Sequence, residues 1–304
     1  MLTLAVLPLL AAAVSSVIHE RRANNRKELR SHYLRMILMG EGAGERYLED
    51  LSLLGGRQSK RVAVEVATAL APYIYRLDEE PLLHLNRMLH LSDFLLTEAS
   101  STRGKKRAQY LAYLSQLPCE NVRLAQLNPF CCDSNRMVRF FAMVAKINID
   151  KANFLHHVAS YTSPLTPFEL SHLISLLRQG SLVVAYQPML NSLSVNLNLL
   201  GLALVREFGI ESAEEHLFKI IERSENYTLR REALYTLAAL ERNLCRLPIV
   251  SFLRSMSRNE SRRFIRFIAV VGYSQKVVDF FVTSHERNYF HSLINSYKIK
   301  IECS

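Results

Sequence analysis

The chain has 304 residues, of which 49% are hydrophobic and 22% charged, a balance that excludes an intrinsically disordered protein. Ten glycines and nine prolines are too few for the turns of an all-β protein and favour helices joined by short loops. The formal net charge of +10 raises affinity for any anionic partner without choosing among them. The five cysteines are odd in number and follow no spacing pattern, which argues against a disulfide framework.

The N-terminal segment has the character of a membrane anchor. Residues 1–18 contain no charged side chain and would reach about 27 Å as a helix, close to the thickness of a bilayer core. A basic block follows within residues 19–30. Because positive charge beside a span stays in the cytoplasm, we expect a single-pass anchor over 1–18, a basic juxtamembrane segment over 19–30 and a cytoplasmic body. A cleaved signal peptide and a buried first helix remain open alternatives for residues 1–18.

From about residue 25 onward, the sequence predicts helix after helix. Thr166, followed by Pro167 and Glu169, predicts a capping box at a helix start, and Ser212 with Glu215 repeats the pattern. We also expect N-caps at two further polar residues, which are Asp133 and Asn259.

One pattern recurs in the predicted helices: an apolar residue, arginine, two variable residues, alanine, and a small residue three positions later. Weaker copies lie at 63–70 and 197–201. Small residues at helical spacing let neighbouring helices approach closely, and two-helix units that cannot bury a face alone stack on one another. The three good copies supply the repeat positions Arg139, Ala142, Arg230, Ala233, Arg266 and Ala269.

This pattern resembles the HEAT-like repeat family, over roughly residues 59–273. The resemblance implies an all-α superhelix, a HEAT-like solenoid, which we expect over residues 31–295, with a C-terminal tail over 296–304. The copies are unevenly spaced, since 91 positions separate Arg139 from Arg230 and only 36 separate Arg230 from Arg266. An armadillo-like stack and an irregular helical bundle therefore remain alternatives.

No motif in the sequence points to catalysis. No phosphate-binding loop, dinucleotide fingerprint or nucleophile elbow is present. Cys131 and Cys132 precede His156 and His157, but adjacent residues on a helix diverge by about 100°, so each pair offers one well-aimed metal ligand. We therefore expect no metal, no cofactor and no enzymatic activity.

Two basic clusters are the candidate sites for an anion or a protein partner, although a solvated turn would have the same composition. We expect Asn259 to break the second cluster between two helices, which leaves Arg262 and Arg263 in a first helical turn, where the helix dipole disfavours cations. The first cluster is Arg103, Lys105, Lys106 and Arg107, and the second is Arg254, Arg258, Arg262 and Arg263.

Together these features predict a membrane-tethered scaffold or adaptor that binds a membrane-associated protein partner at the cytoplasmic face. The alternative is a nucleic-acid-binding protein similar to the HEAT-like DNA glycosylases, which cradle a duplex on a basic surface. The chain contains no tryptophan, and no motif places the carboxylate that such enzymes use. Nothing in the residues selects a third possibility, the lyases and chaperones for cofactor-bearing proteins that some short HEAT-like proteins resemble.

Overall fold

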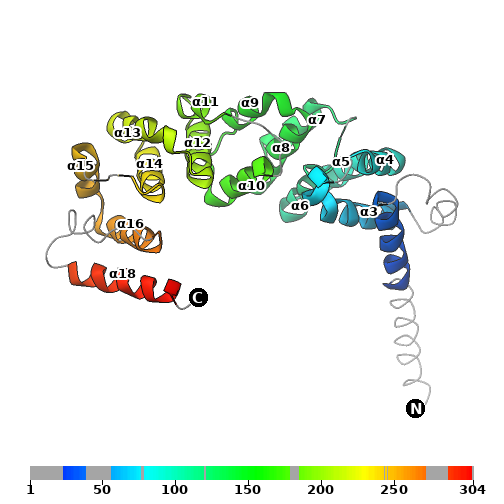
Figure 1. Cartoon of the computed structure of the whole chain (residues 1–304). Helices are drawn as coiled ribbons and strands as arrows, with labels where there is room; N and C mark the ends of the chain where they lie inside the picture. The colour runs from blue at the N-terminus through cyan, green and yellow to red at the C-terminus, as the bar shows by residue number, and fades with distance from the viewer. Residues whose placement is uncertain are drawn as a thin grey trace, which may run out of the picture. The chain divides into compact units, whose positions relative to one another are not determined.

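A computed structural model describes residues 23–38, 56–76, 79–119, 121–178, 185–242, 244, 246–271 and 287–302. Every regular element in these ranges is a helix, so the expected all-α class is confirmed (Figure 1). No helix in these ranges is both long and apolar enough to cross a bilayer. The anchor expected over residues 1–18 lies outside the described residues and stays a prediction.

The contacts divide the chain into two compact units. Unit 1 comprises Met1–His157 and Gln179–Ser181, and unit 2 comprises Val158–Arg178 and Leu182–Ser304. The sequence predicts one continuous repeat domain over 31–295, whereas the observed contacts gather into these two units.

Unit 1 is built around a row of helices in which α3 packs on α5, α5 on α6 and α6 on α8. The helices α4 and α7 pack against α5 and α8 respectively. The row buries a continuous apolar core that includes Leu95, Leu111 and Val138. Besides a helix over 23–38, the elements are α3 Gly56–Leu70, η2 Ala71–Arg76, α4 Glu80–Leu89, α5 Leu91–Ser101, α6 Gly104–Leu114, α7 Leu124–Cys131, α8 Arg136–Ile149 and η3 Lys151–Asn153.

The described part of the expected juxtamembrane segment, residues 23–30, belongs to a helix that packs on this core. Residues 23–38 form one helix, in which Leu29 is buried and the hydroxyl of Tyr33 hydrogen-bonds that of Ser59 on α3. Arg26 and Arg30 form ion pairs with Glu65 on α3, at 2.5 and 2.9 Å. The boundary expected at residue 30 therefore falls inside a packed helix, and two of the basic residues that suggested a juxtamembrane segment brace it.

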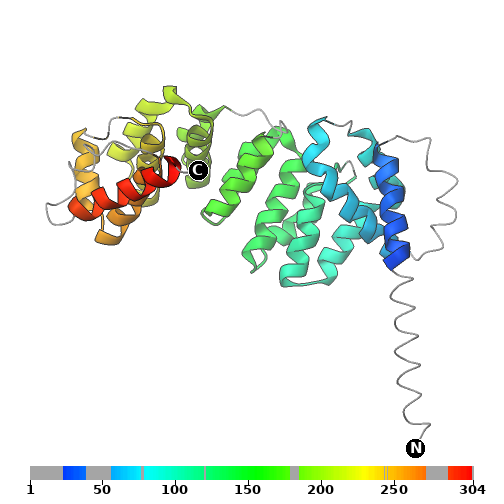
Figure 2. The same ribbon diagram turned by 60° about the horizontal axis from the view of Figure 1, so that its bottom comes forward.

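Unit 2, like unit 1, consists of a row of helices with further helices packed on it. The helices α10, α12, α14, α16 and α18 pack in that order, and α11 and α13 pack on α12 and α14, while α15 packs on α13. Figure 1 shows α11 and α13 above α12 and α14, and Figure 2 shows α18, in red, beside α16. After α9 Phe154–Ala159 at the unit boundary, the elements are α10 Pro167–Arg178, α11 Tyr186–Leu190, α12 Val195–Phe208, η4 Glu211–Ala213, α13 Glu214–Arg223, α14 Tyr227–Ala239, α15 Leu247–Ser255, α16 Arg258–Val270 and α18 Arg287–Glu302.

One of the expected helix N-caps is confirmed. α10 begins at Pro167 with the predicted capping box, in which Glu169 accepts hydrogen bonds from the Thr166 backbone N–H at 2.7 Å and its hydroxyl at 2.9 Å. The cap expected at Ser212 is wrong, because η4 occupies that turn and α13 begins at Glu214 without a side-chain cap.

Two other expected N-caps are wrong by two residues. α8 is capped by Asn135, which accepts from the backbone N–H groups of the first turn, while Asp133 accepts from the Asn135 N–H. α16 is preceded by a capping box of Ser257 and Glu260, so Asn259 lies inside its first turn. Within the C-terminal tail expected over 296–304, the helix α18 continues through Glu302.

The repeat pattern marks helices that pack closely. Ala142 in α8 and Ala233 in α14 are fully buried, whereas the Ala269 side chain lies outside the described residues. In α12 the small position is Gly201, where an added Cβ would lie 3.0 Å from the side chains of both Met189 and Leu190 on α11. The absence of a side chain at Gly201 therefore sets how closely α11 and α12 approach.

Buried asparagines hold the loops between helices. Asn196 at the start of α12 donates to the carbonyl oxygens of Tyr161 at 2.7 Å and Ser163 at 3.1 Å, and accepts from the Leu165 N–H at 2.9 Å. An amide side chain can satisfy donors and acceptors of an irregular loop that no helix could pair. The loop before α10 is thereby fixed to α12.

Candidate protein-binding groove

A groove crosses the helices α10, α12 and α14 of unit 2. Its cavity has a volume of about 390 Å³. Leu170, Ile174 and Leu199 give it an apolar floor, and the residues around them are polar or charged. The polar lining consists of Ser171, Ser175, Arg178, Arg206, Glu207, Thr228, Arg231 and Glu232.

A second depression of about 210 Å³ lies beside the first and is lined by residues of α14 and α16. Arg231 and Glu232 of α14 line both depressions, so the two are neighbours on one surface. We call the combined surface the unit 2 groove. On the α16 side its lining adds Tyr235, Met256, Glu260 and Arg263.

Ion pairs organise the rim of the groove. Arg178 on α10 pairs with Glu207 on α12. Glu232 on α14 serves two arginines, since its carboxylate lies 3.4 Å from Arg206 Nη1 and 3.0 Å from Arg231 Nη2. The Arg178–Glu207 and Arg206–Glu232 pairs connect successive helices, whereas the Arg231–Glu232 pair lies within α14.

The third carboxylate of the groove is held by neutral donors. Glu260 accepts hydrogen bonds from the Ser257 hydroxyl, at 2.8 Å, and from Tyr227. The Ser257 bond and then the Tyr227 bond hold the pKa of Glu260 below its ordinary value, while burial, together with the Glu260 bond and charge, raises the pKa of Tyr227 to about 12. Glu260 is therefore ionised at neutral pH.

Arg263 has no ion pair within the described part of the chain. Its side chain is exposed on α16 and lines the same depression as Arg231 and Glu232. The groove thus presents four guanidinium groups and three carboxylates, one of which is shared by two of the arginines.

The residues of each predicted basic cluster do not share one environment in the structure. Arg103, Lys105 and Lys106 are exposed at the start of α6, but Arg107 is braced, because its Nε donates to the Ala99 carbonyl at 3.0 Å and its Nη1 lies 2.5 Å from Asp133 Oδ2. The first cluster therefore has three solvent-facing cations, and they lie in unit 1.

The second predicted cluster also divides. Arg254 on α15 and Arg258 at the start of α16 are exposed, while Arg262 lies over the ring of Tyr289 on α18, 5.8 Å from its centroid. Of the eight candidate residues from the two clusters, Arg263 lines the unit 2 groove. The expected place of Arg262 and Arg263 in a first helical turn is wrong, because α16 begins at Arg258 and both arginines lie in its second turn.

The repeat arginines do not line the groove. Arg139 donates through Nη1 to the carbonyl oxygens of Asp133 at 2.7 Å and Ser134 at 3.0 Å. Arg230 donates through Nε to the Ile221 carbonyl at 2.8 Å and lies over the ring of Phe252. Both bind the carbonyl groups of the preceding loop or helix end, so their role is structural, and Arg266 is exposed on α16.

Sequence reasoning missed the arginines of α10, α12 and α14. A signal was present, because the dipeptide Arg-Glu occurs as Arg206-Glu207 and again 25 residues later as Arg231-Glu232. Both copies lie on helices of the row from α10 to α18 and line the groove. The repeat pattern drew attention to Arg230 instead, one position away.

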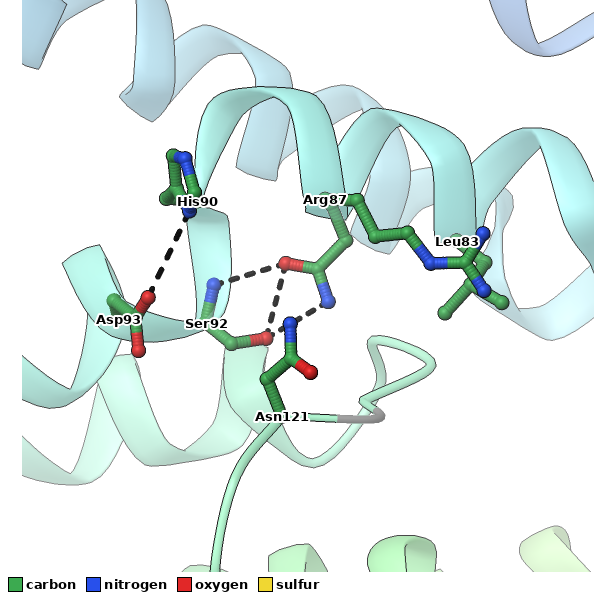
Figure 3. A pocket seen from close by; sticks show the side chains of 7 residues that line it. Leu83, Arg87, His90, Ser92, Asp93 and Asn121 are labelled. Carbon is green, nitrogen blue, oxygen red and sulfur yellow. Dashed lines mark hydrogen bonds and ion pairs between the residues drawn. The ribbon is translucent and has the colours of Figure 1, made fainter.

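A small pocket in unit 1 has a structural explanation. It lies at the turn between α4 and α5 and holds a volume of about 20 Å³, room for little more than one water molecule (Figure 3). Asn86 donates to the Ser92 hydroxyl at 2.8 Å and to the Pro118 carbonyl at 2.7 Å, and accepts from the Ser92 N–H at 2.9 Å. The network fixes the α4–α5 turn to the loop after α6.

Within the described ranges, no cluster of three histidine, cysteine, aspartate or glutamate side chains is arranged to hold a metal ion. Cys119 is half-buried beside Ser92, and burial raises the pKa of its thiol to about 11, so it is a poor nucleophile at neutral pH. No family model, no curated protein and no solved structure matches the chain.

Proposed function

We propose that the chain is a membrane-tethered, non-enzymatic scaffold of the HEAT-like repeat type, and that it binds a segment of a partner protein in the unit 2 groove. The observation that carries the proposal is the groove itself: an apolar floor from α10 and α12, and charged side chains from the four successive helices α10, α12, α14 and α16. A surface of this kind fits an extended polypeptide, whose side chains can enter the floor while its polar groups meet the rim.

The chemistry of the lining supports recognition over catalysis. The residues that line the groove include no histidine and no cysteine. Its glutamates are engaged by arginines or by hydroxyl donors, which leaves them poorly suited to accept a substrate proton.

The repeat assignment rests on how the helices stack. In each unit further helices pack on a row of helices, and the small residues Ala142, Gly201 and Ala233 of the recurrent pattern are buried. Stacked helix pairs of this kind characterise α-solenoids. The membrane tether rests on the uncharged segment 1–18, and fractionation of the full chain and of a chain beginning at residue 23 tests it. Recovery of the full chain entirely in the soluble fraction would remove the tether.

The binding function is tested by selecting an unbiased peptide library on the full chain. Ser175 is exposed in the groove and Ser251 is exposed on α15, so Ser175→Trp blocks the groove and Ser251→Trp is its matched control. We expect the library to yield related sequences that bind wild type and S251W but not S175W. Failure to enrich any sequence, or equal binding to S175W, contradicts the proposal.

A further inference from the structure

The charges of the unit 2 groove do not balance. Arg178 is matched by Glu207, but Arg206 and Arg231 share Glu232. Each of these two arginines gives one nitrogen to that carboxylate, although a guanidinium has five N–H donors. The lining therefore has more charge-assisted donors than carboxylate acceptors.

Arg263 adds to this excess. It has no ion pair among the described residues, and the nearby Glu260 is already held by Ser257 and Tyr227. Arg263 lines the same depression as Arg231 and Glu232. A carboxylate placed between Arg231 and Arg263 would meet two guanidinium groups and could accept from both.

The arginines recur at the spacing of the helices. Arg206, Arg231 and Arg263 come from α12, α14 and α16, which pack in that order. Packed helices lie about 8–10 Å apart, and an extended polypeptide advances about 3.1–3.4 Å per residue. Side chains about three residues apart in a bound extended chain would therefore meet successive arginines.

The other residues that line the groove indicate which side chains a bound peptide would carry between its carboxylates. Leu170, Ile174 and Leu199 form an apolar floor, and the hydroxyl groups of Ser171 and Thr228 can bond a peptide backbone. Glu207, Glu232 and Glu260 interrupt the positive charge, which disfavours a continuous polyanion such as a nucleic acid backbone. The pattern fits discrete carboxylates separated by apolar residues.

We propose that the segment bound in the unit 2 groove is an extended acidic peptide, with carboxylate side chains about three residues apart and apolar residues between them. This rests on the proposed binding function and specifies its ligand. Exposure of the guanidinium groups permits direct access, since the side chains of Arg178, Arg206 and Arg231 are 59%, 33% and 35% exposed.

The test measures binding of labelled peptides to the full chain by fluorescence anisotropy. The probe is a peptide with glutamate at every third position and leucine between, and its controls carry glutamine or lysine in place of glutamate. A single-stranded oligonucleotide of equal net charge is the polyanion control. We expect the glutamate peptide to bind about tenfold or more tightly than the glutamine peptide, with affinity that falls as salt rises.

Two arginines of the same predicted cluster supply matched variants. We expect Arg263→Glu to weaken binding of the glutamate peptide about tenfold or more, and Arg254→Glu, exposed on α15 outside the groove, to change it less than about twofold. Arg263→Lys keeps the positive charge and should bind more tightly than Arg263→Glu. Arg263→Gln removes the charge without reversing it, so it controls for misfolding caused by the new glutamate. Melting temperatures of all variants are measured alongside.

Equal binding of the glutamate and glutamine peptides, or unchanged binding by R263E and R263Q, would overturn the acidic preference. So would an oligonucleotide that binds as tightly and displaces the peptide, which would favour nucleic acid. If the library yields neutral or basic sequences that S175W rejects, the binding function stands and the acidic preference fails. If no peptide binds in the groove, both fail.

Discussion

Arg107 on α6 reaches Asp133, in the loop before α8, with Nη1 2.5 Å from Oδ2, and these two side chains are 22% and 11% exposed. The same guanidinium donates to the Ala99 carbonyl near the end of α5 and lies over the ring of Phe130 on α7. One side chain therefore connects four parts of unit 1, which explains why Arg107, a residue of the first predicted basic cluster, is not available to a ligand.

Replacing Arg107 should destabilise unit 1. We expect Arg107→Ala to lower the free energy of unfolding by about 3 kcal/mol, because Asp133 keeps its charge in a shielded position without its partner. The neighbouring Lys106 is exposed, and Lys106→Ala should change stability by less than about 0.5 kcal/mol. Hydrogen exchange of the α6 and α8 amides measures both, and equal protection in the two variants would contradict the bracing role.

The stability of unit 1 should fall in acid through Glu98. Burial by itself would raise the pKa of this carboxyl, but the hydrogen bonds from Tyr110 and Arg57 and the charges of Arg57 and Arg61 outweigh burial and hold the pKa below its ordinary value. A lowered folded-state pKa contributes stability above the unfolded value of about 4.3, and that stability is lost as pH falls through the folded-state pKa.

Glu98→Gln tests this linkage. We expect the variant to be less stable than wild type at pH 7 and the difference to shrink steadily below about pH 4. Urea unfolding followed at a series of pH values gives the two curves. Curves that stay parallel down to pH 2 would show that Glu98 carries no such linkage.

The contact between α11 and α12 should tolerate no side chain at Gly201. We expect Gly201→Ala to destabilise unit 2 by about 1–3 kcal/mol, because the added methyl group would lie 3.0 Å from Met189 and Leu190. Gly56 begins α3 with open space around it, so Gly56→Ala should be neutral or stabilising by up to about 1 kcal/mol. Thermal unfolding compares the pair, and a neutral G201A would mean that the helices separate at little cost.

The loop before α10 should depend on Asn196. Asn196→Ala leaves the Leu165 N–H and two carbonyl groups without their partner, and each buried group left unpaired costs about 1–3 kcal/mol. We expect a loss of about 3 kcal/mol and rapid exchange of the Leu165 amide proton. Asn259→Ala is the control, since Asn259 is exposed and caps no helix, and it should change stability by less than about 0.5 kcal/mol.

Features within one turn of the chain were predictable. The capping box of Thr166 and Glu169 joins residues three apart, and the burial of Ala142 and Ala233 follows from helical spacing. The errors at Asp133, Ser212 and Asn259 have a common cause. Several polar residues next to a helix start can serve as its cap, and the neighbouring helices decide which one does, as when Arg107 engages Asp133 and leaves Asn135 to cap α8.

By itself the sequence determined the all-α class, the close approach of helices at small residues and the absence of a recognisable catalytic motif, because these depend on composition and on spacing within single helices. The tertiary structure alone decided which arginines face a groove. Arg230 and Arg231 are adjacent in the sequence, yet Arg230 braces the carbonyl of Ile221 while Arg231 lines the groove. Adjacent residues of a helix point about 100° apart, and only the packing of α14 against α12, α13 and α16 determines which direction is open.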